Sequence, residues 1–212
     1  MTTEKPSFLI RYIWIIAAII GVASLTIMRT CEPRGLNQIM PLGKAPTFNL
    51  TAQDGSAFDS RTLAGEVWVA SFIFTSCRTE CPVIGKANQD LLDALADTRA
   101  RLVSITVDPE FDTPEVLTTW GRTYGTTPER WKLLTGPRSE ITRVVTEFAA
   151  HMGKREVDGG LVTIAHSQYL YLVDPAGDFY KFDLRSPDQL KYLPDYVRYF
   201  EAEQRKQQGG PK

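Results

Sequence analysis

The chain has 212 residues, of which 43% are hydrophobic and 23% charged, and a formal net charge of −1 at pH 7. These are ordinary values for a globular protein. The sequence has no dense run of lysine and arginine, which argues against the basic surface that binds nucleic acid. Three cysteines are too few for a disulfide scaffold, so any role they have is chemical.

An uncharged apolar segment lies near the N-terminus. Tyr12 to Met28 are 17 residues without a charge, and with the apolar residues before them they reach the roughly 20 that cross a bilayer. A cleaved signal peptide is the rival interpretation, because Gly21-Val22-Ala23 resembles a cleavage site, but the apolar run continues beyond it. We therefore expect residues 1–30 to be a transmembrane anchor, followed by Cys31 as an incidental thiol.

The expected location follows from this segment. No basic transit peptide precedes it, which favours a bacterial inner membrane, and the few residues ahead of the span favour a soluble domain on the periplasmic or extracytoplasmic side. Residues 31–44 contain Pro33, Gly35, Pro41 and Gly43, so they are predicted to be a linker.

Beyond the linker, strand-like and helix-like patterns alternate. The expected elements are a hairpin of residues 47–50 and 56–59, a strand 66–74, a helix 82–98, a strand 101–107, a helix from 112, a strand 131–134, a helix 139–152, a hairpin of 168–173 and 179–182, and a helix 187–204. This order predicts an α/β fold with a mixed sheet between helices. It is typical of a thioredoxin-like domain with an extra N-terminal β-hairpin and an insertion before the last hairpin. We expect the domain to span residues 45–205 and residues 206–212 to be a disordered tail.

Two cysteines stand where a buried strand gives way to a helix, at Cys77 and Cys81. The positive end of a helix dipole stabilises a thiolate, which is both the nucleophile and the soft-metal ligand. Residues four apart on a helical turn have Cβ atoms about 5–6 Å apart, near the roughly 3.5–4.5 Å of a disulfide. The spacing therefore fits a redox pair and equally a metal clamp.

A histidine completes the candidate set. His166 lies just before the expected strand 168–173, in the segment that packs against the cysteine loop in thioredoxin-like folds. His151, near the end of an expected helix, is interpreted as structural. Two thiolates and one imidazole are too few for structural zinc, which takes four ligands, whereas they suit Cu(I), and Cu(II) with an added oxygen ligand.

At this point the chain resembles the Sco/SenC family. The resemblance rests on three segments, Phe72–Pro82 (FIFTSCRTECP), Val107–Pro114 (VDPEFDTP) and His166 ahead of Tyr169–Asp174. It implies a copper metallochaperone that serves the binuclear copper site of cytochrome c oxidase, with one copper ion, Cu(I) or Cu(II), on Cys77, Cys81 and His166. Implied partners are the copper-bearing oxidase subunit and an upstream periplasmic copper chaperone.

The chain departs from the family pattern after the first cysteine. The family usually has proline and aspartate there, whereas this chain has Arg78 and Thr79. The cationic Arg78 is expected to favour the thiolate. Asp108 matches the acidic residue of the family's VDP segment, and we carry it over as an outer-sphere group or fourth ligand. The alternative is a turn-forming aspartate at a strand end.

Two other functions fit the cysteines. The main alternative is a thiol–disulfide reductase that keeps cuproprotein cysteines reduced, with Cys77 and Cys81 as its redox pair. His166 discriminates, because disulfide exchange needs only the cysteines. A thiol peroxidase is the third interpretation, and the pairing of Cys77 with Cys81 argues against it.

Overall fold

The structure is a computed structural model that describes residues 12, 15–17, 19–21, 39–77, 80–158, 161–166 and 168–209, without the side chains of residues 80, 81 and 161. It divides into two units, Met1–Ile39 and Met40–Lys212. Most of the expected anchor, residues 1–30, lies outside the described residues. Among those that are described, no helix has both the length and the apolar character that a bilayer crossing requires.

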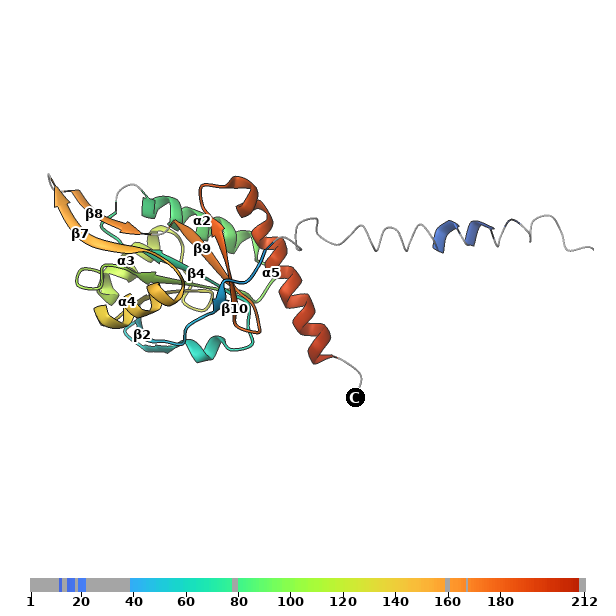
Figure 1. Cartoon of the computed structure of the whole chain (residues 1–212), viewed down its shortest axis with the longest axis horizontal. Coiled ribbons are helices and arrows are strands. Elements are labelled where there is room, and N and C mark those ends of the chain that lie inside the picture. The colour runs from blue at the N-terminus through green and yellow to red at the C-terminus, as the bar shows by residue number, and fades with distance from the viewer. Residues whose placement is uncertain are drawn as a thin grey trace, which may run out of the picture. The chain divides into compact units, whose positions relative to one another are not determined.

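The second unit is built on one mixed sheet. Within the described residues it has eight strands in the order β1-β10-β9-β4-β5-β6-β2-β3 (Figure 1). β4, β5 and β6 are parallel, and the other neighbours are antiparallel. The strands are β1 (Gly43–Lys44), β2 (Asn49–Ala52), β3 (Ala57–Asp59), β4 (Trp68–Ile73), β5 (Arg101–Thr106), β6 (Trp131–Thr135), β9 (Tyr169–Val173) and β10 (Asp178–Asp183).

Both expected hairpins are present, β2–β3 and β9–β10. Their turns contain Gly55 and Gly177, whose φ angles of 80° and 82° lie in the left-handed region that glycine adopts without a Cβ penalty. The first hairpin joins the sheet through β6. The mixed sheet with an N-terminal β-hairpin is therefore confirmed. The strand β1 shows that the last two residues of the expected linker pair with β10.

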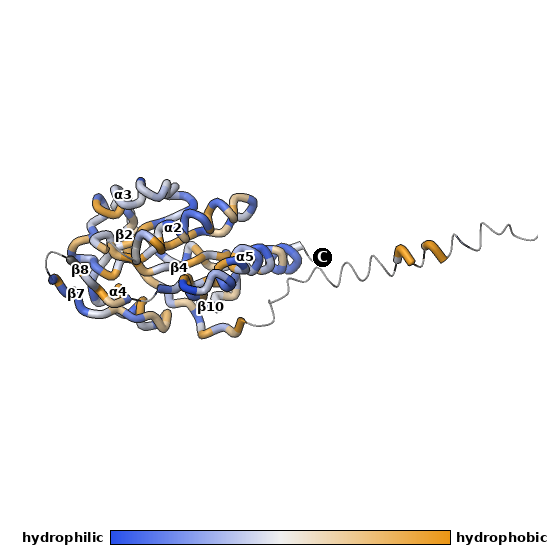
Figure 2. The backbone as a smooth tube through the Cα atoms, turned by 90° about the horizontal axis from the view of Figure 1, so that it is seen from above, coloured by the Kyte–Doolittle hydropathy of each residue, from blue (hydrophilic) through white to orange (hydrophobic). Residues whose placement is uncertain are grey.

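Helices cover both faces of the sheet. They are α2 (Glu80–Ala94), α3 (Pro114–Thr123), α4 (Arg138–Glu147) and α5 (Pro187–Gln208), with a short 3-10 helix, η2 (Ser60–Leu63). α2 and α3 lie on one face and α4 on the other (Figure 2). The α5 side chains of Tyr196 and Phe200 pack on β10. This helix continues beyond the expected end at Gln204 and so includes residues 206–208 of the expected tail.

The core on the α4 face is aromatic. Phe148, just after α4, has edge-on or tilted ring contacts with Trp68, Phe72, Tyr171 and Phe179 at 5.2–6.0 Å between centroids. All five side chains are at most 4% exposed. Close-packed rings from three strands and one helix end hold β4 in the centre of the sheet, and the candidate site follows directly from β4.

The helix expected over residues 139–152 is too long, and this is a correction. α4 ends at Glu147, because Phe148 turns into the aromatic core and Ala149 takes a φ of 51°. Met152–Asp158 forms β7, which pairs with β8 (Leu161–His166) as a separate two-stranded sheet, the β7–β8 ribbon. The ribbon extends beyond the eight-stranded sheet at the upper left of Figure 1. The sequence pattern had predicted only an insertion before the last hairpin here.

Candidate metal centre

Cys77 lies in the loop that follows the central strand. β4 ends at Ile73 and α2 begins at Glu80, and the Cys77 N–H donates to the Phe74 carbonyl at 3.3 Å. Cys77 is 7% exposed. Cys81 is the second residue of α2, and its side chain lies outside the described part of the structure. Its backbone is thus in the first turn of the helix, where the dipole favours a negative charge.

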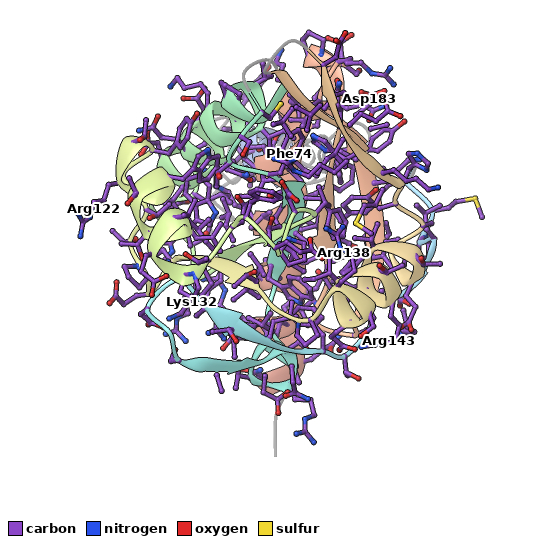
Figure 3. All side chains as sticks on the ribbon, turned by 90° about the vertical axis from the view of Figure 1, so that its left-hand side faces the viewer. Phe74, Arg122, Lys132, Arg138, Arg143 and Asp183 are labelled. Atoms are coloured by element: carbon purple, nitrogen blue, oxygen red, sulfur yellow. The ribbon has the colours of Figure 1, made fainter. Side chains whose placement is uncertain are left out.

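His166 is brought to the same loop from far along the chain. It is the last residue of β8, and its half-buried ring meets the Phe74 ring edge-on, with 5.4 Å between centroids and an interplanar angle of 88°. Figure 3 looks onto the ribbon end of the second unit, and Phe74, which is buried, is labelled above the middle of this view. Phe74 therefore contacts both candidate ligand segments, through its carbonyl and through its ring.

A buried carboxylate holds the cysteine loop. Asp112 accepts hydrogen bonds from the Thr75 N–H at 3.1 Å, the Thr75 hydroxyl at 2.5 Å and the Thr106 hydroxyl at 2.5 Å. Burial raises the pKa of Asp112 above its ordinary value, and the nearby Asp108 carboxylate adds to the rise. Thr75 is two residues from Cys77, so these bonds connect the loop to the end of β5.

Asp108 is also buried, and its carboxylate faces two guanidinium groups. The side chain is 0% exposed, and Oδ2 accepts a hydrogen bond from Arg155 Nε at 3.1 Å. Arg138 Nη2 lies 3.7 Å from Oδ1, which has no hydrogen-bond partner among the residues that the structure describes. A buried carboxylate needs such compensation, since removing an unpaired charge from water is costly. Both expected roles of Asp108, an outer-sphere group and a fourth ligand, stay predictions.

The three-ligand set stays a prediction. Among the side chains that the structure describes, no group of three or more histidines, cysteines, aspartates and glutamates is placed to hold a metal ion. The Cys81 side chain, one of the three expected ligands, is outside that set.

Sequence reasoning missed three residues around the site: Asp112, Arg155 and Phe111. Asp112 had been noted only as the start of a helix, and nothing in the local pattern indicated that its carboxylate reaches Thr75. Arg155 lay between the expected helix 139–152 and the expected hairpin from residue 168, outside any predicted element. Phe111 is 50% exposed, and its ring lies 3.6 Å from Arg155 Cζ. An aromatic residue between two acidic residues, Glu110 and Asp112, was the signal that the sequence offered.

The fold is that of a thioredoxin-like domain, and the candidate cysteine and histidine site lies at the carboxyl end of its central strand. The chain belongs to the SCO1/SenC family, whose model matches residues 40–204. This confirms the resemblance inferred from the three sequence segments.

Relatives and solved structures agree with this assignment. A SCO1 protein homolog of Bacillus subtilis (strain 168) is 34% identical over 164 residues, which cover 75% of this chain and 83% of that protein. A putative copper-binding protein of Stutzerimonas stutzeri is 30% identical over 159 residues, covering 73% and 76%.

Three solved structures have a similar fold. A SCO1/SenC family lipoprotein from Bacillus anthracis has a TM-score of 0.70 and 27% identity, covering 78% of this chain and 99% of that one. BsSco has a TM-score of 0.66 and 32% identity, covering 76% of this chain and 96% of that one. It is described as a member of the Sco family of cytochrome c oxidase assembly proteins, and a disulfide switch has been identified in it. Bradyrhizobium japonicum ScoI with copper bound has a TM-score of 0.64 and 25% identity, covering 74% and 99%.

Proposed function

We propose that this chain is a membrane-anchored copper metallochaperone that delivers copper to the binuclear copper site of cytochrome c oxidase. Cys77, Cys81 and His166 would hold one copper ion per chain. The observation that carries the proposal is the contact of the His166 ring with Phe74, whose carbonyl accepts the Cys77 N–H. The backbone of Cys77 and the ring of His166, from distant parts of the chain, both contact Phe74, and this supports the proposal.

The chemistry of the donors supports copper as the cargo. Thiolate and imidazole are the ligands that Cu(I) prefers, and Cu(II) can add an oxygen. Structural zinc takes four ligands, and Asp108 is engaged with Arg155 and Arg138, which leaves it poorly suited as the fourth. We therefore propose that Asp108 acts from the outer sphere.

Similar proteins support the same cargo and destination. ScoI of Bradyrhizobium japonicum has been solved with copper bound, and the Stutzerimonas stutzeri relative is named a putative copper-binding protein. BsSco is described among cytochrome c oxidase assembly proteins. The copper-bearing oxidase subunit would be the acceptor, and a periplasmic copper chaperone the donor.

Anchoring at the bacterial inner membrane belongs to the proposal. A tether confines the domain to the plane in which a membrane oxidase presents its empty site, which raises the effective concentration. The Bacillus anthracis neighbour is named a lipoprotein, so attachment to a membrane by other means occurs in the family. Retention of the full-length chain in membranes after an alkaline wash is expected, and release would contradict the anchor.

A thiol–disulfide reductase is the second candidate function. The spacing of Cys77 and Cys81 favours it, and so does the disulfide switch described for BsSco. Both functions use the same cysteines, so a test must depend on His166.

The first experiment measures metal on the purified full-length chain in detergent under reducing conditions. One copper per chain is expected, with Cu(I) retention abolished by Cys77→Ser and by Cys81→Ser. The chain supplies its own matched controls, because Cys31→Ser and His151→Ala remove the same donor types elsewhere and should keep the copper. Stoichiometric zinc in preference to copper under competition would refute the proposal.

The second experiment separates the two functions. His166→Ala should lose Cu(II) first, because Cu(II) favours nitrogen and oxygen donors, while Cu(I) is partly kept by two thiolates. Disulfide exchange should fall far less. Cells carrying His166→Ala should show an oxidase defect comparable with that of the cysteine variants. Normal oxidase activity in His166→Ala beside an inactive Cys77→Ser would favour the reductase.

A further inference from the structure

The β7–β8 ribbon that carries His166 is held to the rest of the domain by side chains and not by strand pairing. Among the described strands, neither β7 nor β8 pairs with the eight-stranded sheet. A two-stranded ribbon alone is only marginally stable in water, so its position depends on side-chain contacts with the rest of the domain. The position of the imidazole therefore depends on the same contacts.

Arg155 makes two of these contacts at once. Its Nε donates to Oδ2 of the fully buried Asp108 at 3.1 Å, and its Cζ lies 3.6 Å from the centroid of the Phe111 ring. The planar guanidinium can pair with a carboxylate through its edge while its face stacks on an aromatic ring, which an ammonium cannot do. Both Asp108 and Phe111 belong to the connection between β5 and α3, so Arg155 attaches β7 to that connection.

The register of the ribbon links Arg155 to His166. Arg155 pairs with Ile164, and His166 follows two residues later and pairs with Met152. Directly opposed residues share a face of a ribbon, as do residues two apart on one strand. Ile164 is 1% exposed, and Arg155 and His166 are half-buried, whereas the intervening Ala165 is exposed. One face of the ribbon thus carries Arg155, Ile164 and His166 toward the domain.

We propose that Arg155 is a positioning residue for His166. By pairing with Asp108 and stacking on Phe111, it fixes the ribbon on the β5–α3 connection and holds the imidazole against Phe74. The same connection holds the cysteine loop, because Asp112 accepts hydrogen bonds from Thr75. The segment from Asp108 to Asp112 therefore sets the distance between the thiol half and the imidazole half of the site, with one carboxylate for each half.

This inference rests on the proposed function for its metal readout and carries a readout that needs no metal. The variants are Arg155→Met, which removes the charge, and Arg155→Lys, which keeps the charge without the planar fork. The matched control is Lys154→Met, which removes an exposed cation from the next position of the same strand. The double variant Asp108→Asn with Arg155→Met removes both charges and leaves no buried carboxylate without its partner. It replaces the single variant if Arg155→Met alone fails to fold.

In the full-length chain in detergent, Arg155→Met should weaken Cu(II) binding by about tenfold, the lower end of the usual loss when an outer-shell partner of a ligand is removed. The Cu(II) electron paramagnetic resonance spectrum should change in Arg155→Met, and Arg155→Lys should recover the wild-type spectrum only in part. Lys154→Met should match the wild type. Thiol–disulfide exchange at Cys77 and Cys81 should stay within about twofold, because the cysteine loop is held separately through Thr75.

The metal-free readout is the modification rate of His166 by diethyl pyrocarbonate in the apo protein, followed by mass spectrometry, with the exposed His151 as internal reference. Faster modification in Arg155→Met and in the double variant, and not in Lys154→Met, supports the proposal. Unchanged His166 reactivity in both would overturn it, as would an unchanged Cu(II) spectrum in a folded Arg155→Met. A wild-type chain that binds no copper would refute the proposed function, and the His166 rates would still decide the role of Arg155.

Discussion

The central sheet and the β7–β8 ribbon supply the two halves of the candidate site in different ways. The cysteine loop continues from β4, which pairs with β5 on one side and β9 on the other and has six buried residues. His166 ends a ribbon whose strand β7 has only half-buried and exposed residues. Local stability follows buried contacts and protected hydrogen bonds, so we expect the thiol half to be as stable as the core and the imidazole half to open at a lower free energy.

This difference bears on the proposed metallochaperone function, in which the site accepts an ion and later releases it. A rigid thiol half would keep the cysteine donors in place when no ion is bound. A less stable imidazole half would let an ion enter and leave without unfolding of the core. The predictions below test whether the two halves differ in this way.

The largest effect is expected in the aromatic core beneath β4. Phe72 is 0% exposed and meets Phe148 and Tyr171 at 5.8 and 5.6 Å between centroids. Phe72→Ala should lower the free energy of unfolding by about 3–5 kcal/mol, from lost burial and the cavity left behind. Urea unfolding followed by circular dichroism measures it. Val157→Ala, at a ribbon residue that is 61% exposed, is the control and should cost at most about 0.5 kcal/mol. Similar losses in both variants would remove the distinction between core and ribbon.

Truncation of the buried ribbon residue should act locally. Ile164→Ala is expected to lower the free energy of ribbon opening by about 2–4 kcal/mol, because Ile164 is 1% exposed. Hydrogen exchange should accelerate at the β7 and β8 amides while the β4 and β5 amides keep their wild-type rates. Equal acceleration in β4 and β5 would show that the ribbon and the sheet unfold as one unit.

Substitution of Asp112, the carboxylate that binds the cysteine loop, should have an intermediate effect. Asp112→Asn replaces one acceptor oxygen by an N–H₂ donor and removes the negative charge, which weakens the bonds that Asp112 accepts from Thr75 and Thr106. The expected cost is about 1–3 kcal/mol in the free energy of unfolding, accompanied by faster alkylation of Cys77. Asp90→Asn, on the exposed face of α2, is the matched control. Unchanged Cys77 reactivity would show that Asp112 does not hold the loop.

The same carboxyl group predicts a pH dependence with a definite sign. Burial, with a smaller contribution from Asp108, raises the pKa of Asp112 above its ordinary value of 3.8. The unfolded state then loses its proton at lower pH than the folded state, so the contribution of Asp112 to stability falls as pH rises from the unfolded pKa to the raised folded pKa. Asp112→Asn lacks this titration. The stability difference between the wild type and this variant, measured by urea unfolding across acidic pH, should therefore shift against the wild type as pH rises through that window.

The smallest effect is expected from removal of residues 1–35. Met40–Lys212 forms a compact unit with its own core, so the shortened chain should fold with a free energy of unfolding within about 0.5 kcal/mol of that of the full chain. Urea unfolding of both chains in the same detergent makes the comparison. A larger loss would show that the N-terminal unit contributes to the stability of the domain.

The sequence by itself determined the order of the elements and the local setting of the cysteines. Asp54-Gly55 and the turn before Asp178 end strands through backbone conformations that only a few residue types adopt easily. The buried run before Cys77 and the helical pattern after it placed the thiol between a strand and a helix. These features depend on residues within a few positions of one another, and for that reason short patterns can reveal them.

Only the tertiary structure decided how the parts of the site are held. α4 ends at Glu147 because Phe148 fills a core formed by distant strands. The helical periodicity over residues 139–152 is a local pattern and does not indicate where that core lies. Asp108 and Arg155 form an ion pair, and Asp112 binds Thr75, through contacts between residues 47 and 37 positions apart. Such pairs follow from strand register and from the cost of burying an uncompensated carboxylate, and both arise only once the chain has packed.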